Sequence, residues 1–296
     1  MLLTFVFAFL SLFPSASTDE WKKSFTIENI PKLRVESGDA NIRVLASESK
    51  TVDVRVISDG YKIGDDGIKI IDRQNGDNVE IEVRFPRRWF QMNWRSKRVD
   101  IEINVPRETN LDLNTGDGRI DLSGVKGEIL LRSGDGKINL TDVHGRLSAK
   151  TGDGNIEMRN VKGEISMSTG DGRIEATGLE GAFRAETGDG RLRIQGRFDA
   201  LDIRTGDGGI EATALDGSKT ESNWSLKTGD GDITLRLPET LSADVEMHTN
   251  DGHIDLNIPV SVVGRTGNNE IRGRINSGGK MLYLKTGDGS IRLEKL

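Results

Sequence analysis

The chain has 296 residues, 34% hydrophobic and 5% aromatic, with 36 glycines and 6 prolines, a composition typical of stacked repeats and unusual for a compact enzyme. Its 47 acidic and 41 basic residues are mixed along the chain and give a net charge of -6, so no general polyanion-binding face is implied and nucleic acid is not an expected partner. The absence of cysteine excludes disulfides, thiolate metal sites and a lipid-modified cysteine.

The N-terminal segment, residues 1–17, has the pattern of a secretory signal peptide. An apolar run from Leu2 to Phe13 is too short to span a bilayer comfortably, and Ser15 and Ser17 fit a small-x-small cleavage site. No Lys or Arg precedes the run, so an uncleaved anchor or a different start is the alternative. We expect an exported protein that resides in the periplasm, at the cell surface or outside the cell.

Residues 18–110 contain strand patterns without a regular period. The segments LRVES, NIRVLA, TVDVRVIS, VEIEVRF and VDIEINVP each alternate apolar and polar residues. A repeat stack with a bare end presents an unpaired strand edge that recruits other chains. We therefore expect residues 18–110 to form an irregular β segment that caps a repeat domain over residues 111–296. The C-terminal IRLEKL shows no cap beyond Glu294 and Lys295, which also suggests self-association through the ends of the stack.

A cationic and aromatic segment, PRRWFQMNWRSKR, interrupts the cap at residues 86–98. Aromatic rings interleaved with cations suit peripheral membrane contact, sugar stacking or binding of an anionic cell-wall polymer. The alternative is that the tryptophans pack on the end of the stack while the arginines stay solvated. The candidate ligand residues of this loop are Arg87, Arg88, Trp89, Phe90, Trp94 and Arg95.

A Thr-Gly-Asp-Gly or Ser-Gly-Asp-Gly element returns every 18 residues from residue 115 onward. The regular copies begin at Thr115, Ser133, Thr151, Thr169, Thr187 and Thr205. An early copy begins at Ser37, later ones at Thr228, Thr249 and Thr286, and a decayed one at Thr266. Self-similarity at this period indicates a repeat architecture in which each unit buries its apolar side on its neighbours.

Each unit contains two short strand patterns separated by two turns. After the Gly-Asp-Gly turn come alternating apolar pairs such as Ile120/Leu122, and a second strand follows with pairs such as Ile129/Leu131. These patterns predict an all-β fold, and the constant unit length favours a β-solenoid with two strands per coil. Ten or so coils at about 4.8 Å each would form a rod of about 50 Å. Because Asp-Gly is also a hairpin signal, an antiparallel meander folded into a sandwich or barrel is the alternative.

Stacking of the units would align one aspartate per coil along one edge. The row comprises Asp117, Asp135, Asp153, Asp171, Asp189 and Asp207, and continues with Asp230, Asp251 and Asp288. The secreted nonapeptide β-roll also has 18 residues per coil and holds Ca²⁺ between its turns, so calcium is one explanation of the row. That motif occurs twice per coil, whereas Gly-Asp-Gly occurs once here, and a single carboxylate leaves most of the six to eight calcium ligands unsupplied.

A structural role for the aspartates is the explanation that we favour. An Asp in a tight turn can accept hydrogen bonds from the backbone N–H groups that follow it, and flanking glycines permit the turn. The next side chain is often basic, as at Arg119, Lys137, Arg173 and Arg191, and such a row would screen the carboxylates. We therefore expect no cofactor and no metal, with calcium as the alternative.

The regularity of residues 115–210 argues against catalysis. A catalytic centre should break the repeat locally with unusual charged residues, and none does so there. Because parallel β-helices host polysaccharide-active enzymes with clustered acidic residues, such an enzyme is an alternative.

The repeat, the VDIEINVP segment and the GRINSGGKMLYLKTGDGSIRL ending resemble the bacterial putative-adhesin family of Gly-Asp repeat domains. The likeness covers residues 30–296 and lies in the repeat pattern, without catalytic residues to transfer. It implies an all-β, exported or envelope-associated protein. We expect a noncatalytic adhesin or scaffold whose partner is a glycan, an envelope polymer or a protein.

Overall fold

The structure is a computed structural model and describes residues 18–65, 67–86, 97–262, 267 and 269–296. These residues form a continuous 25-stranded sheet, with no helix among them, which confirms the all-β prediction. No helix that could cross a membrane occurs in the described ranges. The expected signal peptide, residues 1–17, lies outside them.

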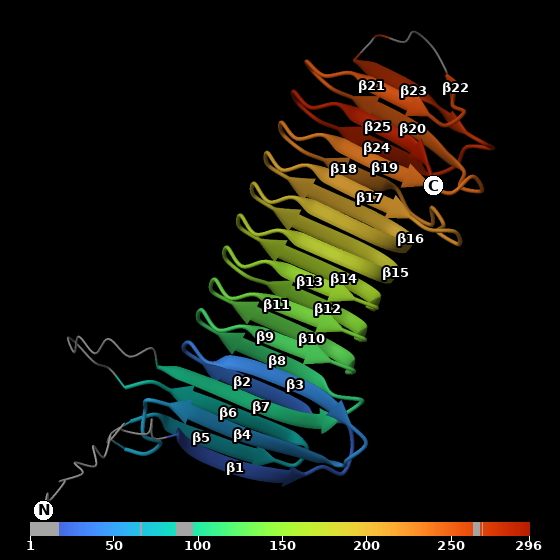
Figure 1. Cartoon of the computed structure of the whole chain (residues 1–296). Coiled ribbons are helices and arrows are strands. Elements are labelled where there is room, and N and C mark those ends of the chain that lie inside the picture. The colour runs from blue at the N-terminus through green and yellow to red at the C-terminus, as the bar shows by residue number, and fades with distance from the viewer. Residues whose placement is uncertain (1–17, 66, 87–96, 263–266, 268) are drawn as a thin grey trace, which may run out of the picture.

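Two parallel ladders of strands form the middle of the molecule, an elongated stack in Figure 1. Ladder A contains β9 (Ile120–Ser123), β11 (Ile138–Thr141), β13 (Ile156–Arg159), the first parts of β15 (Ile174–Thr187) and β16 (Leu192–Thr205), and β17 (Ile210–Ala214). Ladder B contains β8 (Asn110–Thr115), β10 (Lys126–Ser133), β12 (His144–Lys150), β14 (Lys162–Thr169) and the later parts of β15 and β16. One strand from each ladder makes a coil.

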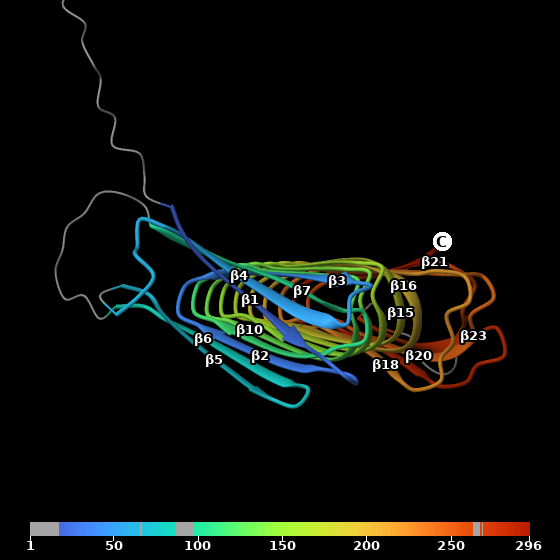
Figure 2. The same cartoon turned by 90° about the horizontal axis from the view of Figure 1, so that it is seen from below.

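The spacing of the repeat explains the register of the ladders. In ladder A, Ile138 pairs with Ile120 on one side and with Ile156 on the other. Equivalent residues of successive units therefore lie side by side. Because side chains alternate across a strand, every second position faces the interior, and these three isoleucines are 0% exposed. Seen along the stack in Figure 2, the sheet wraps nearly closed around this apolar interior.

The two turns of a coil use different chemistry. The Thr-Gly-Asp-Gly turn, called the corner below, leads from ladder B to ladder A. The opposite turn has a residue with positive φ, which is Asp142 at 54° and Asn160 at 55° in two coils. Asn and Asp tolerate this left-handed conformation better than other non-glycine residues. The amide of Asn160 also donates to Asp142 Oδ1 at 3.1 Å, which links the two turns.

At the N-terminal end the sheet becomes antiparallel. The strands are β1 (Thr18–Thr26), β2 (Lys32–Ser37), β3 (Asn41–Ser47), β4 (Thr51–Asp59), β5 (Lys69–Asn75), β6 (Asn78–Arg84) and β7 (Arg98–Pro106). β2 and β3 make a coil between β8–β9 and β6–β7, all in parallel. Antiparallel β5 covers β6, and antiparallel β4 and β1 cover β7. The outer strands carry charged residues such as Lys22, Lys23 and Arg73, which discourage pairing with other chains.

At the other end the order of the coils departs from the order of the sequence. The strands are β18 (Trp224–Lys227), β19 (Ile233–Leu237), β20 (Ala243–His248), β21 (Ile254–Asn257), β22 (Ser261–Val262), β23 (Glu270–Ile275), β24 (Met281–Lys285) and β25 (Ile291–Lys295). β24 and β25 lie between the coil of β18–β19 and that of β20–β21. Antiparallel β23 and β22 complete this end. The IRLEKL segment, expected at a bare end, therefore lies inside the stack.

Candidate functional site

The corner is held together by a buried hydroxyl rather than by its aspartate. Thr151 is 1% exposed, and its Oγ1 donates toward Gly134 O at 3.2 Å and Gly136 O at 2.9 Å in the preceding coil. In several corners the same oxygen accepts the N–H of the glycine three residues later, as in Gly190 to Thr187 at 3.3 Å. The expected Asx-turn is thus replaced by a Thr or Ser turn, because the hydroxyl lies closer to the turn interior. The signal was present in the sequence, since every regular corner starts with Thr or Ser.

The aspartate points out of the corner and leans over the next coil. Asp135 Oδ1 accepts the backbone N–H of Asp153 at 3.3 Å, and Asp39 Oδ1 that of Asp117 at 3.4 Å. A Cβ added to Gly152 would meet Asp135 Oδ1 at 2.4 Å. The glycine that precedes each aspartate therefore leaves room for the aspartate of the preceding coil.

The aspartates form the predicted row, called the corner row below, and all its members are exposed. It comprises Asp117, Asp135, Asp153, Asp171, Asp189, Asp207, Asp230, Asp288 and Asp251 in stack order. Within the described ranges, no Lys or Arg nitrogen lies within 4.0 Å of these carboxylates. The basic residues after the corner, such as Arg119 and Arg173, therefore screen the row only at a distance.

The six aspartates proposed for calcium lie in register, with one carboxylate from each coil. Across residues that the structure describes, no group of three or more His, Asp or Glu side chains is arranged to hold a metal ion. The aspartates bind neighbouring backbone instead, as the contacts of Asp39 and Asp135 show.

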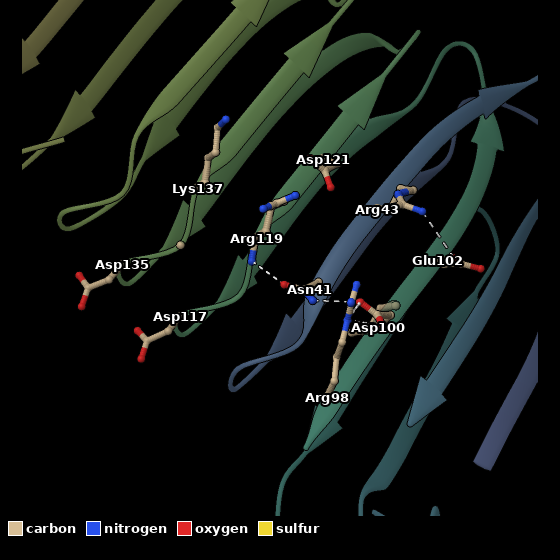
Figure 3. Close-up of a pocket in the computed structure, with 12 residues that line it drawn as sticks. Asn41, Arg43, Arg98, Asp100, Glu102, Asp117, Arg119, Asp121, Asp135 and Lys137 are labelled. Atoms are coloured by element: carbon tan, nitrogen blue, oxygen red, sulfur yellow. Dashed lines mark hydrogen bonds and ion pairs between the residues drawn. The ribbon is translucent and has the colours of Figure 1, made fainter. Parts of the chain in front are cut away.

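A polar groove of about 590 Å³ opens beside the N-terminal end of the corner row, between β7, β3, β9 and β11 (Figure 3). Arg98 pairs with Asp100 at 2.8 Å, and Arg43 with Glu102 at 3.7 Å. Asn41 connects the strands, since its amide donates to Asp100 Oδ1 at 2.9 Å.

The opposite wall of this groove carries charges that are less fully paired. The backbone N–H of Arg119 donates to Asn41 Oδ1 at 3.0 Å, but no carboxylate lies within 4.0 Å of its guanidinium among the described residues. Asp117 and Asp135 lie at the rim in Figure 3. Cations and anions thus alternate across the groove, an arrangement suited to a hydrated polar ligand.

Shifted pKa values on this surface arise from ion pairs between strands. Hydrogen bonds from Arg236 at 2.8 Å and Arg193 at 3.0 Å hold the pKa of Glu211 below its usual value of 4.5. The pKa of Asp232 is lowered first by the backbone N–H of Ser290 and then by Arg292. Because structural ion pairs shift pKa values in this way, these groups mark inter-coil contacts.

The other candidate ligand residues, Arg87, Arg88, Trp89, Phe90, Trp94 and Arg95, lie outside the described residues.

A family profile described as Toastrack DUF4097 matches residues 30–294. No curated protein matches the chain. Among solved structures, the chain is similar to a "putative cell adhesion protein" from Clostridium sporogenes, at 14% identity and a TM-score of 0.26, over 94% of this chain and 100% of that one.

Two further solved structures come from related comparisons. One is a "putative lipid binding protein" from Parabacteroides distasonis, at 15% identity and a TM-score of 0.34, over 93% of this chain and 96% of that one. The other is a "putative adhesin" from Bacteroides fragilis, at 10% identity and a TM-score of 0.33, over the same shares of 93% and 96%. TM-scores this low carry no argument about function.

Proposed function

Because the chain belongs to the Toastrack DUF4097 family, with an all-β fold of stacked strands, we propose that it is a noncatalytic, exported cell-envelope protein that acts as an adhesin or scaffold. The observation that carries the proposal is the parallel register. It places equivalent polar side chains in straight rows along the stack, as in the corner row. A partner can contact such a surface at many equivalent points.

We also propose that the fold is a β-solenoid, with residues 18–110 as its cap and residues 111–296 as its repeat domain. The 18-residue offset between paired strands supports the solenoid, because each coil then repeats the one before it. The role of residues 1–17 as a signal peptide is part of the same proposal and rests on the sequence pattern.

The absence of catalysis is likewise a proposal. It is supported by the type of contact that shifts pKa values, since Glu211 and Asp232 are held by inter-strand hydrogen bonds. The alternatives are a polysaccharide-active enzyme and a calcium-binding β-roll-like surface protein. Turnover of a polysaccharide by the purified chain would favour the first, and a calcium-dependent rise in melting temperature the second.

Localisation and binding test the proposed function together. Fractionation of the producing cells should place the chain in the envelope or the medium, and the mature chain, residues 18–296, should bind whole cells or envelope fragments. Recovery in the cytosol, or no binding to any envelope fraction, would contradict the proposal.

Removal of whole coils tests whether binding is spread along the stack. Deletion of residues 134–169 removes two units of 18 residues and joins Ser133 to Gly170, which preserves the corner sequence. We expect this variant to fold and to bind envelope material more weakly in proportion to its length. Deletion of half a unit, residues 134–142, is the control and should disrupt folding, because it brings ladder A residues into ladder B. Undiminished binding by the two-unit deletion would show that one local site carries the activity.

A further inference from the structure

Four basic side chains from successive coils lie in register near the C-terminal end of ladder B. Arg204 pairs with Lys227, Lys227 with Lys285, and Lys285 with His248. These four residues are called the basic ladder below. Neighbouring strands lie about 4.8 Å apart, so the ladder is a straight line of donors parallel to the long axis. Two of its members are 58 residues apart in sequence, because β24 inserts next to β18.

The carboxylates nearest to the basic ladder are engaged by other arginines. Asp202 lies 2.9 Å from Arg184 and 3.4 Å from Arg204, so two cations share one anion. Glu246 pairs with Arg272 at 3.3 Å, on the side away from the ladder. In the part of the chain that the structure describes, no carboxylate lies within 4.0 Å of Lys227 or Lys285.

Tyr283 holds Lys227 in place without neutralising it. The Lys227 ammonium lies 5.0 Å from the centroid of the Tyr283 ring, on the neighbouring strand. A cation–π contact orients the ammonium but adds no negative charge. The anionic residues in register with the ladder, Glu186 and Glu270, occur only at its two ends. The positive charge between them is therefore available to an outside anion.

A groove on the same face approaches the basic ladder. It has a volume of about 580 Å³ and crosses the outer face of β12, β14, β15 and β16. Small side chains such as Ser148, Ser166 and Ala182 line it, and Arg184 and Arg204 belong to its wall. Within the described ranges, Ser225 Oγ and Asp202 Oδ1, both on lining residues, have no hydrogen-bond partner. Buried polar atoms of this kind are usually paired, so the groove has hydrogen-bonding capacity in reserve.

We propose that this groove and the basic ladder bind a linear anionic polysaccharide along the stack. Its acidic groups would pair with Arg204, Lys227 and Lys285, and its hydroxyls would hydrogen-bond the polar lining of the groove. A linear polymer fits because the cations repeat along one axis at the spacing of the coils. The small, polar lining offers no stacked aromatic platform for unpaired bases, which favours a saccharide over single-stranded nucleic acid. The proposal deepens the envelope function above and rests on it.

Charge reversal of the ladder tests the proposal with polygalacturonate as the probe, a polymer with one carboxylate per sugar. The full mature chain should bind it and should not bind uncharged dextran of similar length. The K227E/K285E variant should bind at least about tenfold more weakly, and the slope of log affinity against log salt should fall by about two.

The matched control is R173E/R191E. Both arginines are exposed, follow the corner on ladder A, and change the net charge by the same amount. We expect this variant to bind polygalacturonate within about threefold of the natural chain. Equal losses in the two variants, or none in K227E/K285E, would overturn the proposal. Melting curves identify a variant that fails to fold, and K227Q/K285Q then replaces it.

Envelope binding separates this inference from the function on which it rests. If the natural chain and K227E/K285E bind envelope fragments equally, the polysaccharide site is wrong and the envelope function stands. If polygalacturonate binding depends on the ladder but the chain binds no envelope fraction, the envelope function fails and the site stands.

Discussion

The middle of the stack and its two ends bury the same kind of apolar side chain by different pairings. Between residues 110 and 214, each strand pairs in parallel with the equivalent strand of the next unit. At both ends the outermost strands are antiparallel, and the coil next to each end comes from a distant part of the chain. A parallel stack repeats without a natural stop, so the ends depend on residues that leave the repeat. Stability in the middle should therefore depend on the corner, and stability at the ends on topology.

The largest effect should follow removal of the inserted coil, residues 281–296. Leu282, Leu284, Ile291 and Leu293 are each 0% exposed, and full burial of one such side chain contributes about 1.5–3 kcal/mol. Without this coil, β20 and β21 lose their parallel partners. We expect loss of amide protection in residues 233–262, with protection kept in residues 120–200, measured by hydrogen exchange.

The comparison for this truncation is removal of β1, residues 18–26. β1 pairs with β4 alone among the described strands, so its loss should affect only the N-terminal end. Retained protection of β20 and β21 after removal of residues 281–296 would show that these strands are not held by the inserted coil.

The next largest effect should come from adjacent glycines at one corner. A Cβ at Gly208 would lie 2.0 Å from the carbonyl oxygen of Gly190, whereas at Gly209 the nearest atom is 3.6 Å away. G208A should therefore lower the free energy of unfolding by about 3 kcal/mol or more, because the opposing atom is backbone. G209A should change it by less than about 1 kcal/mol. Urea unfolding measures both, and equal values would refute the role of close coil contact.

A smaller effect should follow loss of one corner hydroxyl. T151V keeps the shape of the side chain but removes the donor to Gly134 O and Gly136 O, at a cost of about 1–3 kcal/mol in the free energy of unfolding. T151S keeps the hydroxyl, as Ser133 does naturally, and should cost less than T151V. If both variants unfold at the same denaturant concentration, the hydroxyl does not stabilise the corner.

The smallest effect should come from an inter-coil ion pair. The pKa of folded Glu211 lies below its usual value of 4.5, so its stabilisation is present above pH 4.5 and is lost as the pH falls below it. E211Q should remove roughly 0.5 kcal/mol at pH 7 and less at acidic pH. The control E175Q changes an exposed glutamate and should not alter the pH dependence of melting. Identical pH profiles for both variants would contradict the contribution of the pair.

The regular middle could be predicted from local pattern. Alternating residues such as Ile120 and Leu122 are buried, and a constant unit length leads to in-register neighbours. The role of the corner aspartate was assigned too locally. The turn was treated as if it were isolated, but Asp135 bonds to the coil that follows it. A contact between coils cannot be read from one unit.

The order of the C-terminal coils could not be predicted from sequence. The corners at Thr228, Thr249 and Thr286 are nearly identical, so local chemistry permits more than one stacking order. The connections decide it, since β23 turns back against β20 and returns the chain to the gap beside β18. The basic ladder was hidden for the same reason. A balanced overall composition does not reveal that Lys227 and Lys285 become neighbours.

The inserted coil also constrains how the molecule is assembled. A chain is made from its N-terminus, so residues 243–257 emerge before residues 281–295, which must separate them from β18 and β19. Folding during synthesis or export can proceed coil by coil as far as β19 but cannot continue in sequence order. If β20 and β21 docked early on β18 and β19, they would occupy the place of the last coil and would have to dissociate. Completion of this end is therefore expected to be the slow step of maturation, and the stage at which a partly folded chain is most exposed to aggregation.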